Sequence, residues 1–321
     1  GKRIGQTQLL RTTYQRFGKQ LKSGFNGWTV AIITSEQDLA KSLGLRAFRK
    51  NTLYNGPIKS VLYQYRIDSH AVQDSAKSAQ SGAGDSTGKP LTTAAEITVS
   101  EHQQMFINRL KKNYNHLKKW ARKNRVSCYR VYDADIPQYA VAIDKYDNWV
   151  HVQEYQAPKT VDKNKAFQRI NDVIDVVADI LETEQEHVVL KVRKRQEGTS
   201  QYQKQDQKQR KISVRESGLK FLINIHDYID TGLFLDHRQT RQLIKQLAGK
   251  RSFLNLFAYT GSVTVYAAAG GARTTTTVDM SNTYLKWAQE NMSINGYTGD
   301  KHKFIREDCL QWMQDAIENK Q

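Results

Sequence analysis

Cysteine, proline and long apolar runs are all scarce in this sequence of 321 residues. Its only cysteines are Cys128 and Cys309, too few for a disulfide framework or a cysteine-based zinc site, so we expect a reducing, cytoplasmic environment. The eight histidines show no metal-ligand spacing with cysteines or acids, and we expect no metal. No run approaches the roughly 18 apolar residues of a membrane span, and no export signal opens the chain, so we expect no membrane contact.

Positive charge is abundant and unevenly distributed. The formal net charge is +17, which makes a large polyanion the first partner to consider. Residues 1–66 hold 12 Lys and Arg against 2 acids, whereas residues 221–321 hold 11 against 10. A segment that binds a small zwitterion needs no large positive charge, whereas a segment that binds the phosphate backbone of a nucleic acid does. The charge therefore predicts nucleic-acid contact away from the C-terminal third.

The order of apolar patterns and turn signals predicts four segments. Residues 1–67 indicate a helix, a strand, a short helix and two extended runs around a turn at Asn55-Gly56-Pro57, an ending typical of many α/β domains. Residues 68–100, rich in Ser, Ala, Thr and Gly, predict a flexible linker. Residues 101–217 predict a compact α+β module, and residues 218–321 alternate strands with helices, as in a parallel sheet.

The stretch RSFLNLFAYTGSVTVYAAAGGA predicts a strand, a loop and an Ala-rich helix, the place where nucleotide-like cofactors bind in doubly wound sheets. Only Gly261 occupies this loop, so the glycine pattern of dinucleotide sites is absent. A pyrophosphate needs several close backbone approaches, whereas S-adenosylmethionine carries no pyrophosphate. The loop therefore favours the methyl donor over NAD, and disfavours an NAD-dependent oxidoreductase.

Two acids follow the next two predicted strands. Asp279 lies eighteen residues after Gly261, where an acid accepts hydrogen bonds from both ribose hydroxyls. Its alternative role is a helix N-cap, although Ser281 fits that role better. Asp308 ends the predicted third strand, positioned to accept from an adenine amino group, with the Cys309 backbone N–H facing the ring. For Asp308 a helix cap remains an equal alternative.

Four ordered motifs now carry a resemblance: DYIDTGLFLDHR, FLNLFAYTGS, TTTTVDMS and EDCLQWM. Together they resemble the K-type half of the bifunctional K/L family of 23S ribosomal RNA guanine methyltransferases. NRLKKNYNHLKKWARKN and the run from Cys128 to Thr160 resemble its middle region, and residues 1–66 resemble the tail of its L-type domain. The resemblance implies a partial class I Rossmann-like methyltransferase fold, preceded by an α+β RNA-contacting module and the C-terminal piece of another such domain.

By the same resemblance, a set of residues surrounds the methyl donor. The segment from Thr231 to Arg238 lies beside the methionine end, the loop lies under the donor, and the two acids bind ribose and adenine. The donor is S-adenosylmethionine, and guanine is methylated at N2 by the L-type half and at N7 by the K-type half. The cofactor residues expected are Phe234, Asp236, Arg238, Asn255, Tyr259, Gly261, Asp279, Asp308 and Cys309.

The catalytic motifs of the family, Asn-Pro-Pro-Tyr and Asp-Pro-Pro-Thr-Phe, are missing. The chain has four prolines, and no two are adjacent. It opens Gly1-Lys2-Arg3, like the continuation of the L-type motif, and stops shortly before the K-type motif is expected. We therefore expect a fragment cut beside both catalytic loops and inactive alone, because those loops hold the guanine against the methyl group.

RNA contact is predicted for the basic stretches, where cations track phosphates and aromatics such as Tyr114 and Trp120 are interleaved. The alternatives are a solvated helix face and, for Trp120, core packing. The partner expected is 23S ribosomal RNA or its precursor; the competing hypothesis is a non-catalytic RNA-binding module with a vestigial Rossmann half. The expected contacts are Lys111, Lys112, Lys118, Lys119, Arg122, Lys123, Arg125, Lys191, Arg193, Lys194 and Arg195.

Overall fold

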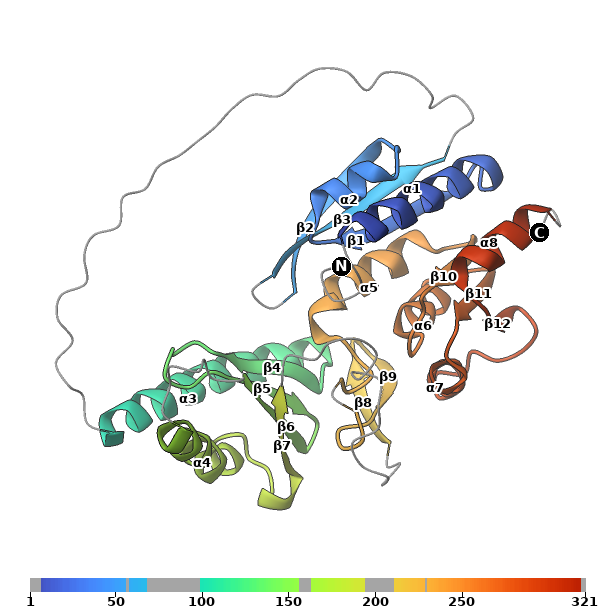
Figure 1. The fold of residues 1–321 in the computed structure, drawn as a ribbon. Helices are drawn as coiled ribbons and strands as arrows, with labels where there is room; N and C mark the ends of the chain where they lie inside the picture. Colours follow the sequence, from blue (N-terminus) through green and yellow to red (C-terminus); the bar gives the residue numbers. More distant parts are fainter. Residues whose placement is uncertain are drawn as a thin grey trace.

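A computed structural model describes residues 7–55, 58–67, 99–155, 163–193, 211–228 and 230–318. The predicted linker lies almost wholly outside these residues. Within them the chain forms an N-terminal unit, a middle sheet with its helices, a hairpin, and a C-terminal parallel sheet (Figure 1). Among the described helices, none is both long and apolar enough to cross a membrane.

The N-terminal unit is a three-stranded antiparallel sheet with two helices. Strand β3 lies between β1 and β2 and pairs with both, Thr29 facing Arg66 at one end. Leu21, Phe25 and Tyr65 bury the helical face against the sheet, as the apolar spacing predicted. The elements are α1 Thr7–Gly24, β1 Thr29–Thr34, α2 Gln37–Ser42, β2 Ala47–Asn55 and β3 Ile58–Arg66.

The middle unit has a four-stranded sheet in the order β4-β5-β6-β7. β6 and β7 are parallel and joined through α4, whereas β4, β5 and β6 form an antiparallel meander. On the long helix α3, Phe106 stacks on Tyr139 with ring centroids 4.7 Å apart. The elements are α3 Val99–Asn124, β4 Cys128–Asp133, β5 Val141–Tyr146, β6 Trp149–Tyr155, α4 Lys163–Ile180, the 3-10 turn η1 Gln185–His187 and β7 Val188–Arg193.

A hairpin of β8 (Ile212–Glu216) and β9 (Leu219–Ile223) spans the expected boundary between residues 217 and 218. Its turn has positive φ at Ser217 (54°) and Gly218 (84°), the conformation that tight two-residue hairpins require. Buried residues of the hairpin share one apolar core with both the middle sheet and α6. The division into segments remains a prediction, since the hairpin packs on both sides of it.

The C-terminal unit alternates strands and helices, as predicted. Its sheet, in the order β10-β11-β12, is entirely parallel. We expected the last strand to reach Asp308, but β12 ends at Arg306 because the Asp308 carboxylate accepts from the amides that begin the next helix. The elements are η3 Leu235–His237, α5 Arg238–Leu247, β10 Ser252–Leu256, α6 Ser262–Ala269, β11 Thr274–Asp279, α7 Asn282–Ser293, β12 His302–Arg306 and α8 Cys309–Glu318.

A buried ion-pair cluster joins the hairpin to α5 and α6. Glu216 accepts hydrogen bonds from Arg241 Nε at 2.7 Å, Arg238 Nε at 2.7 Å and the Tyr266 hydroxyl at 2.9 Å. Burial alone would raise the pKa of Glu216, but the charges and hydrogen bonds of the two arginines outweigh it and hold that pKa below its ordinary value. Arg238 also donates to the Cys128 carbonyl, which ties α5 to the middle sheet.

Helix α1 of the N-terminal unit packs on α8 at the other end of the chain (Figure 1). Met313 of α8 is fully buried in the same apolar cluster as Leu21 and Phe25. The side-chain amide of Gln20 donates to the Leu310 carbonyl at 3.0 Å. The two ends of the chain therefore share a core, which no local sequence pattern predicted.

Candidate cofactor-binding site

The loop between β10 and α6 is held in an unusual backbone conformation. Phe257 (φ 53°), Tyr259 (φ 52°) and Gly261 (φ 68°) all adopt left-handed geometry, which is costly for the two aromatic residues. A Cβ at Gly261 would lie 2.6 Å from the Cβ of Ala288 on α7, so only glycine fits there. The loop thus turns sharply and exposes the start of α6 at the carboxyl edge of the sheet.

Asp279, the last residue of β11, fixes this loop. Its Oδ2 accepts from the Tyr259 backbone N–H at 2.9 Å, and its Oδ1 accepts from the Ser281 N–H at 2.9 Å. The predicted cap of α7 is Ser281, whose side chain accepts from Tyr284 N–H at 3.3 Å. Asp279 is therefore not that cap. Because a carboxylate offers about four acceptor positions, two remain for ligand hydroxyls.

Asp308 and Cys309 begin α8 beside the end of β12. The Asp308 carboxylate accepts from the backbone N–H groups of Leu310 at 2.9 Å and Gln311 at 3.1 Å, which is the cap role left open above. The Cys309 thiol is buried and accepts from Phe257 N–H at 3.2 Å, and burial raises its pKa to about 11. Cys309 therefore stabilises the loop as a neutral thiol. Their contact with adenine remains a prediction.

Apolar side chains are exposed around this edge. Phe257 is 66% exposed, Met280 65% and Phe234 42%, high values for large apolar groups. The first two follow β10 and β11 directly, so they flank Asp279 at the carboxyl end of the sheet. Phe234 packs against Tyr259, with ring centroids 5.4 Å apart. These surfaces suit the apolar faces of an adenosine and a methionine chain.

The segment after Tyr228 is held against the loop through its glycine. The carbonyl of Gly232 accepts from the Thr260 hydroxyl at 2.6 Å, and a Cβ at Gly232 would lie 2.4 Å from the Trp287 ring. Burial lowers the pKa of His237, so its ring is neutral at pH 7. Asp236 is half-buried beside it. The segment therefore borders the loop, and its place beside the methionine end of the donor stays a prediction.

Two of the expected cofactor residues, Arg238 and Asn255, use their side chains in hydrogen bonds to other residues of the chain. Arg238 uses its guanidinium on Glu216 and the Cys128 carbonyl, and none of these contacts involves the loop 257–261. Asn255 donates to the Thr264 hydroxyl at 3.0 Å, inside the strand-helix packing beneath the loop. Their direct contact with a cofactor stays a prediction. Sequence reasoning missed Thr264, nine residues from Asn255, and the buried Glu216 cluster, whose arginines lie 22 and 25 residues from Glu216.

The expected RNA contacts divide by location. All seven on α3 and its C-terminal end are exposed, and Lys118 pairs with Glu182. Lys191 differs: its ammonium donates to the Tyr228 carbonyl, and burial lowers its pKa to about 8. The Arg193 side chain, Lys194 and Arg195 lie outside the described residues. Only the helical set forms a cationic surface in the described structure.

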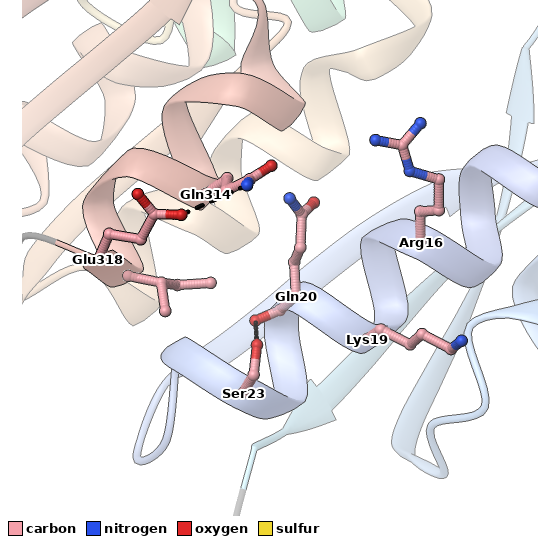
Figure 2. A pocket seen from close by; sticks show the side chains of 7 residues that line it. Arg16, Lys19, Gln20, Ser23, Gln314 and Glu318 are labelled. Atoms are coloured by element: carbon pink, nitrogen blue, oxygen red, sulfur yellow. Dashed lines mark hydrogen bonds between the residues drawn. The ribbon is translucent and has the colours of Figure 1, made fainter.

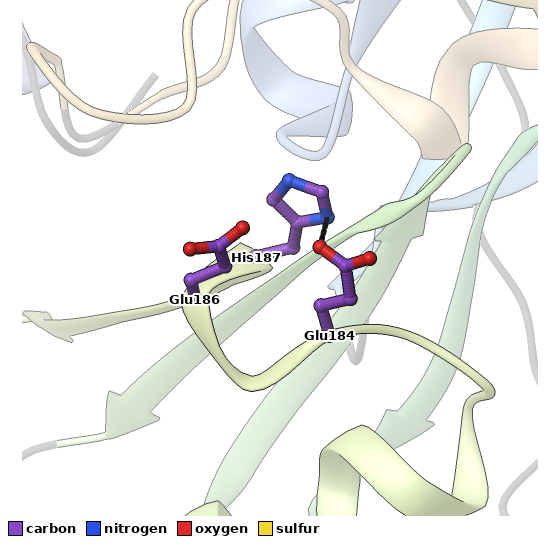
Figure 3. A group of neighbouring side chains, drawn as sticks. All are labelled: Glu184, Glu186 and His187. Carbon is purple, nitrogen blue, oxygen red and sulfur yellow. Dashed lines mark ion pairs between the residues drawn. The ribbon is translucent and has the colours of Figure 1, made fainter.

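One group of possible metal ligands occurs among the described residues, far from this loop in sequence: Glu184, Glu186 and His187 (Figure 3). Both glutamates are exposed, and His187 Nδ1 lies 3.9 Å from Glu184 Oε2. The His187 ring packs on Trp149 with centroids 4.3 Å apart. Exposed carboxylates of this kind occur without an ion, so the group assigns no metal site.

A cavity of about 310 Å³ lies where α1 meets α8, lined by Arg16, Lys19, Gln20 and Gln314 among others (Figure 2). It is shallow and contains no residue of the strand ends at β10 and β11. None of the expected cofactor residues lines this cavity.

Comparison with known protein families identifies the cofactor. A family model described as S-adenosylmethionine-dependent methyltransferase matches residues 125–314. The chain belongs to this methyltransferase family. A second model, described as an RMKL-like methyltransferase domain, matches residues 1–64. These matches confirm S-adenosylmethionine as the cofactor and the Rossmann-like methyltransferase fold predicted from the motifs.

Curated relatives cover the methyltransferase chain from end to end. This chain is 46% identical over 329 residues to the ribosomal RNA large subunit methyltransferase K/L of Methylococcus capsulatus. The alignment covers 100% of this chain and 44% of the relative. The chain is 45% identical to the K/L enzyme of Aliivibrio fischeri, covering 98% of this chain and 42% of the relative. The resemblance to the K/L family is confirmed, and the chain spans less than half the length of these relatives.

Two solved structures share the fold. A protein from Streptococcus mutans described as a SAM-dependent methyltransferase superposes with a TM-score of 0.56 at 20% identity, covering 71% of this chain and 57% of its own. A second methyltransferase structure, in complex with SAH, gives a TM-score of 0.55 at 18% identity, covering 85% of this chain and 61% of that one. At such identities the likeness concerns the fold alone.

Proposed function

We propose that this chain is part of an enzyme that methylates guanine in large-subunit ribosomal RNA. The single observation that carries the proposal is the 46% identity to a K/L enzyme along the whole chain. Residues 218–321 would belong to the half that methylates N7, and residues 1–67 to the half that methylates N2. The substrate would be 23S ribosomal RNA or its precursor, in the cytoplasm.

The residues around the loop fit the donor that the family uses. S-adenosylmethionine supplies a methyl group on a positively charged sulfur. Asp279 would accept from the ribose hydroxyls, the loop from Tyr259 to Gly261 would lie under the donor, and Asp308 with the Cys309 N–H would border the adenine. The exposed Phe234, near Tyr259, would exclude water from the methionine side.

The role of these residues is to bind and orient, because methyl transfer is an in-line displacement whose rate depends on holding the reacting atoms in near-attack geometry. Guanine N7 needs no proton removed first, so no strong base is required. Guanine itself would be held by the family's Pro-Pro loops, and this sequence contains no two adjacent prolines. We therefore expect these 321 residues to bind the donor without transferring its methyl group.

RNA contact is assigned to the exposed cations of α3. Nine Lys and Arg lie between Arg109 and Arg130 with no acid among them. A surface of this kind binds phosphates at a strength that falls steeply with salt. The buried Lys191 would contribute little, because its ammonium already has a carbonyl partner.

Calorimetric titration with S-adenosylmethionine tests the proposal. We expect one binding site, and no radiolabel transferred from donor to 23S ribosomal RNA, with a full-length K/L enzyme as positive control. A chain that binds RNA but gives no heat with the donor would favour the competing hypothesis of a non-catalytic RNA-binding module. Labelled guanine above a no-protein control would contradict the expected inactivity.

A further inference from the structure

A groove of about 510 Å³ lies between the C-terminal end of α3, the β8–β9 turn at Ser217 and helix α5. This volume falls within the roughly 300–1,000 Å³ typical of small-molecule sites. Of its lining residues only Arg238 is among the expected cofactor residues, and its guanidinium donates to Glu216 and the Cys128 carbonyl. The groove is therefore a feature that methyl-donor binding leaves unexplained.

One wall of the groove is a row of amides. Gln239, Gln242 and Gln246 line it from α5, at the spacing that aligns side chains on one helical face. None of the three amides hydrogen-bonds to any residue that the structure describes. Each presents a donor and an acceptor together, the pairing with which glutamine and asparagine recognise nucleobase edges.

Trp120 lines the groove from α3, and Arg238, the first residue of α5, lies on the same helix as the glutamines. The Arg238 guanidinium lies over the Trp120 ring, 5.3 Å from its centroid, and its bond to Glu216 at 2.7 Å fixes it there. Both the indole and the planar guanidinium are groups on which nucleobases stack. Arg238 thus has a role here that its place in the sequence motif did not indicate.

The α3 edge of the groove, its rim, carries positive charge. Lys123 and Arg125 are exposed and flank Asn124, one of the lining residues. No carboxylate lines the groove, and the nearest acid of the cluster, Glu216, is fully buried against two arginines. A phosphate backbone would follow the rim while a base entered between the walls.

We propose that this groove holds an unpaired nucleotide of the RNA substrate, its base against Trp120 and Arg238 and its edge on the glutamine amides. The inference rests on the proposed function, since it deepens where and how the RNA is held. It assigns base contact to the groove and phosphate contact to the remainder of α3. An abasic strand should therefore lose the first contact and keep the second.

Fluorescence anisotropy with the full chain separates these contacts. The probes are a labelled single-stranded RNA and an abasic strand of the same length. Both have about 12 nucleotides, within the roughly 4–16 nucleotides that single-strand-binding folds cover. The variant Gln242→Leu with Gln246→Leu should bind the RNA about tenfold more weakly, roughly 1.4 kcal/mol, and the abasic strand unchanged, because only a base edge hydrogen-bonds to the amides. The matched control changes two exposed glutamines of α8, Gln311→Leu with Gln314→Leu, and should bind both probes as the parent does.

Crosslinking gives a second measurement that does not depend on the stability of a variant. With 4-thiouridine in the RNA, crosslinked peptides should map to α5 or to the end of α3 that carries Trp120. Equal RNA affinity in the parent and the Gln242→Leu/Gln246→Leu variant would overturn the groove while leaving RNA binding by α3 intact. Displacement of the RNA by poly-glutamate as efficiently as by unlabelled RNA would also overturn it. Failure of the parent chain to bind either probe at low salt would overturn the groove and the proposed RNA function together.

Discussion

The loop 257–261 and helix α3 are opposite kinds of surface. The loop is nearly neutral, strained and fixed by backbone hydrogen bonds to Asp279 and Cys309. Helix α3 is a regular helix whose cations point into solvent, with a single pairing between Lys118 and Glu182 among its described lysines. We expect a small zwitterion to be bound through the shape of the loop, and a polyanion to be attracted by the summed positive charge of the helix. The two regions therefore should respond differently to the same kind of change.

The buried Glu216 cluster joins these regions, and its removal gives the largest expected effect. Glu216→Leu leaves Arg241, 1% exposed, as an uncompensated buried charge. We expect a loss of about 3–5 kcal/mol in the free energy of unfolding, measured by urea denaturation. Asp38→Ala, which removes an exposed pair with Lys41, is the control and should cost under about 1 kcal/mol.

The pH dependence of the same variant gives a direct check. The pKa of Glu216 is held below its ordinary value of 4.5 in the folded chain, so the ion pair stabilises the fold above that pH and loses its effect as pH falls. Below about pH 4.5 the free energy of unfolding of the parent chain should fall as Glu216 becomes protonated. The Glu216→Leu variant should lack this fall, because it has no ion pair at any pH. Equal stability of the two proteins at pH 7 would refute the cluster's role.

Gly261→Ala tests the geometric side of the comparison. The new Cβ would lie 2.6 Å from Ala288 in a left-handed residue, so we expect about 1–3 kcal/mol of destabilisation and loss of measurable donor binding. Thermal melting and calorimetry with S-adenosylhomocysteine measure both. Gly296→Ala is a matched control, since Gly296 also has positive φ, 78°, but no atom within 4 Å of its Cβ position. If both variants bind the ligand equally, the close approach to Ala288 is unimportant.

Local sequence patterns predicted most of the helices and strands, but not where each one ends or which elements contact one another. The strand-helix alternation after residue 250 and the Ser281 cap follow from apolar spacing and a single side chain, and both are present. The end of β12 was wrong by two residues, because a cap is decided by which carboxylate meets the free amides, not by hydropathy. Lys191 is half-buried and donates to the Tyr228 carbonyl, a contact that its basic neighbours in sequence concealed.

Contacts across long separations in sequence had no local signal. Glu216 meets Arg241 across 25 residues, and Gln20 meets Leu310 across 290. For the site, the motifs pointed to the loop and Asp279, whose contact with the cofactor stays a prediction, whereas the partners of Arg238 emerged only from packing. A conformation set by a backbone turn can thus be predicted from sequence, and a partner set by burial cannot.

Asp279→Asn sharpens the comparison by removing the charge and, because both carboxylate oxygens accept backbone N–H groups, one of the two bonds from Tyr259 and Ser281. A neutral amide accepts more weakly than a carboxylate, and one of its two positions donates, so we expect about tenfold weaker donor binding, or roughly 1.4 kcal/mol. RNA affinity should not change, because Asp279 lies at the end of β11 and not on α3. Asp300→Asn, at an exposed position, is the control for both measurements. A loss of RNA affinity in the Asp279 variant would show that the two regions are coupled.

The smallest expected effect concerns the field of α3 and is best measured as a salt dependence. Lys119→Gln with Lys123→Gln removes two exposed cations one helical turn apart, so the slope of log affinity against log salt for single-stranded RNA should fall by about 1.4. Lys191→Met should leave the slope unchanged, since the Lys191 ammonium is committed to the Tyr228 carbonyl. Donor binding should be the same in all three proteins, because a site selected by geometry does not depend on a distant field. A fall of about 0.7 in the Lys191 variant, the share of one cation, would mean that this half-buried lysine contacts phosphate and that strand β7 also belongs to the RNA-binding surface.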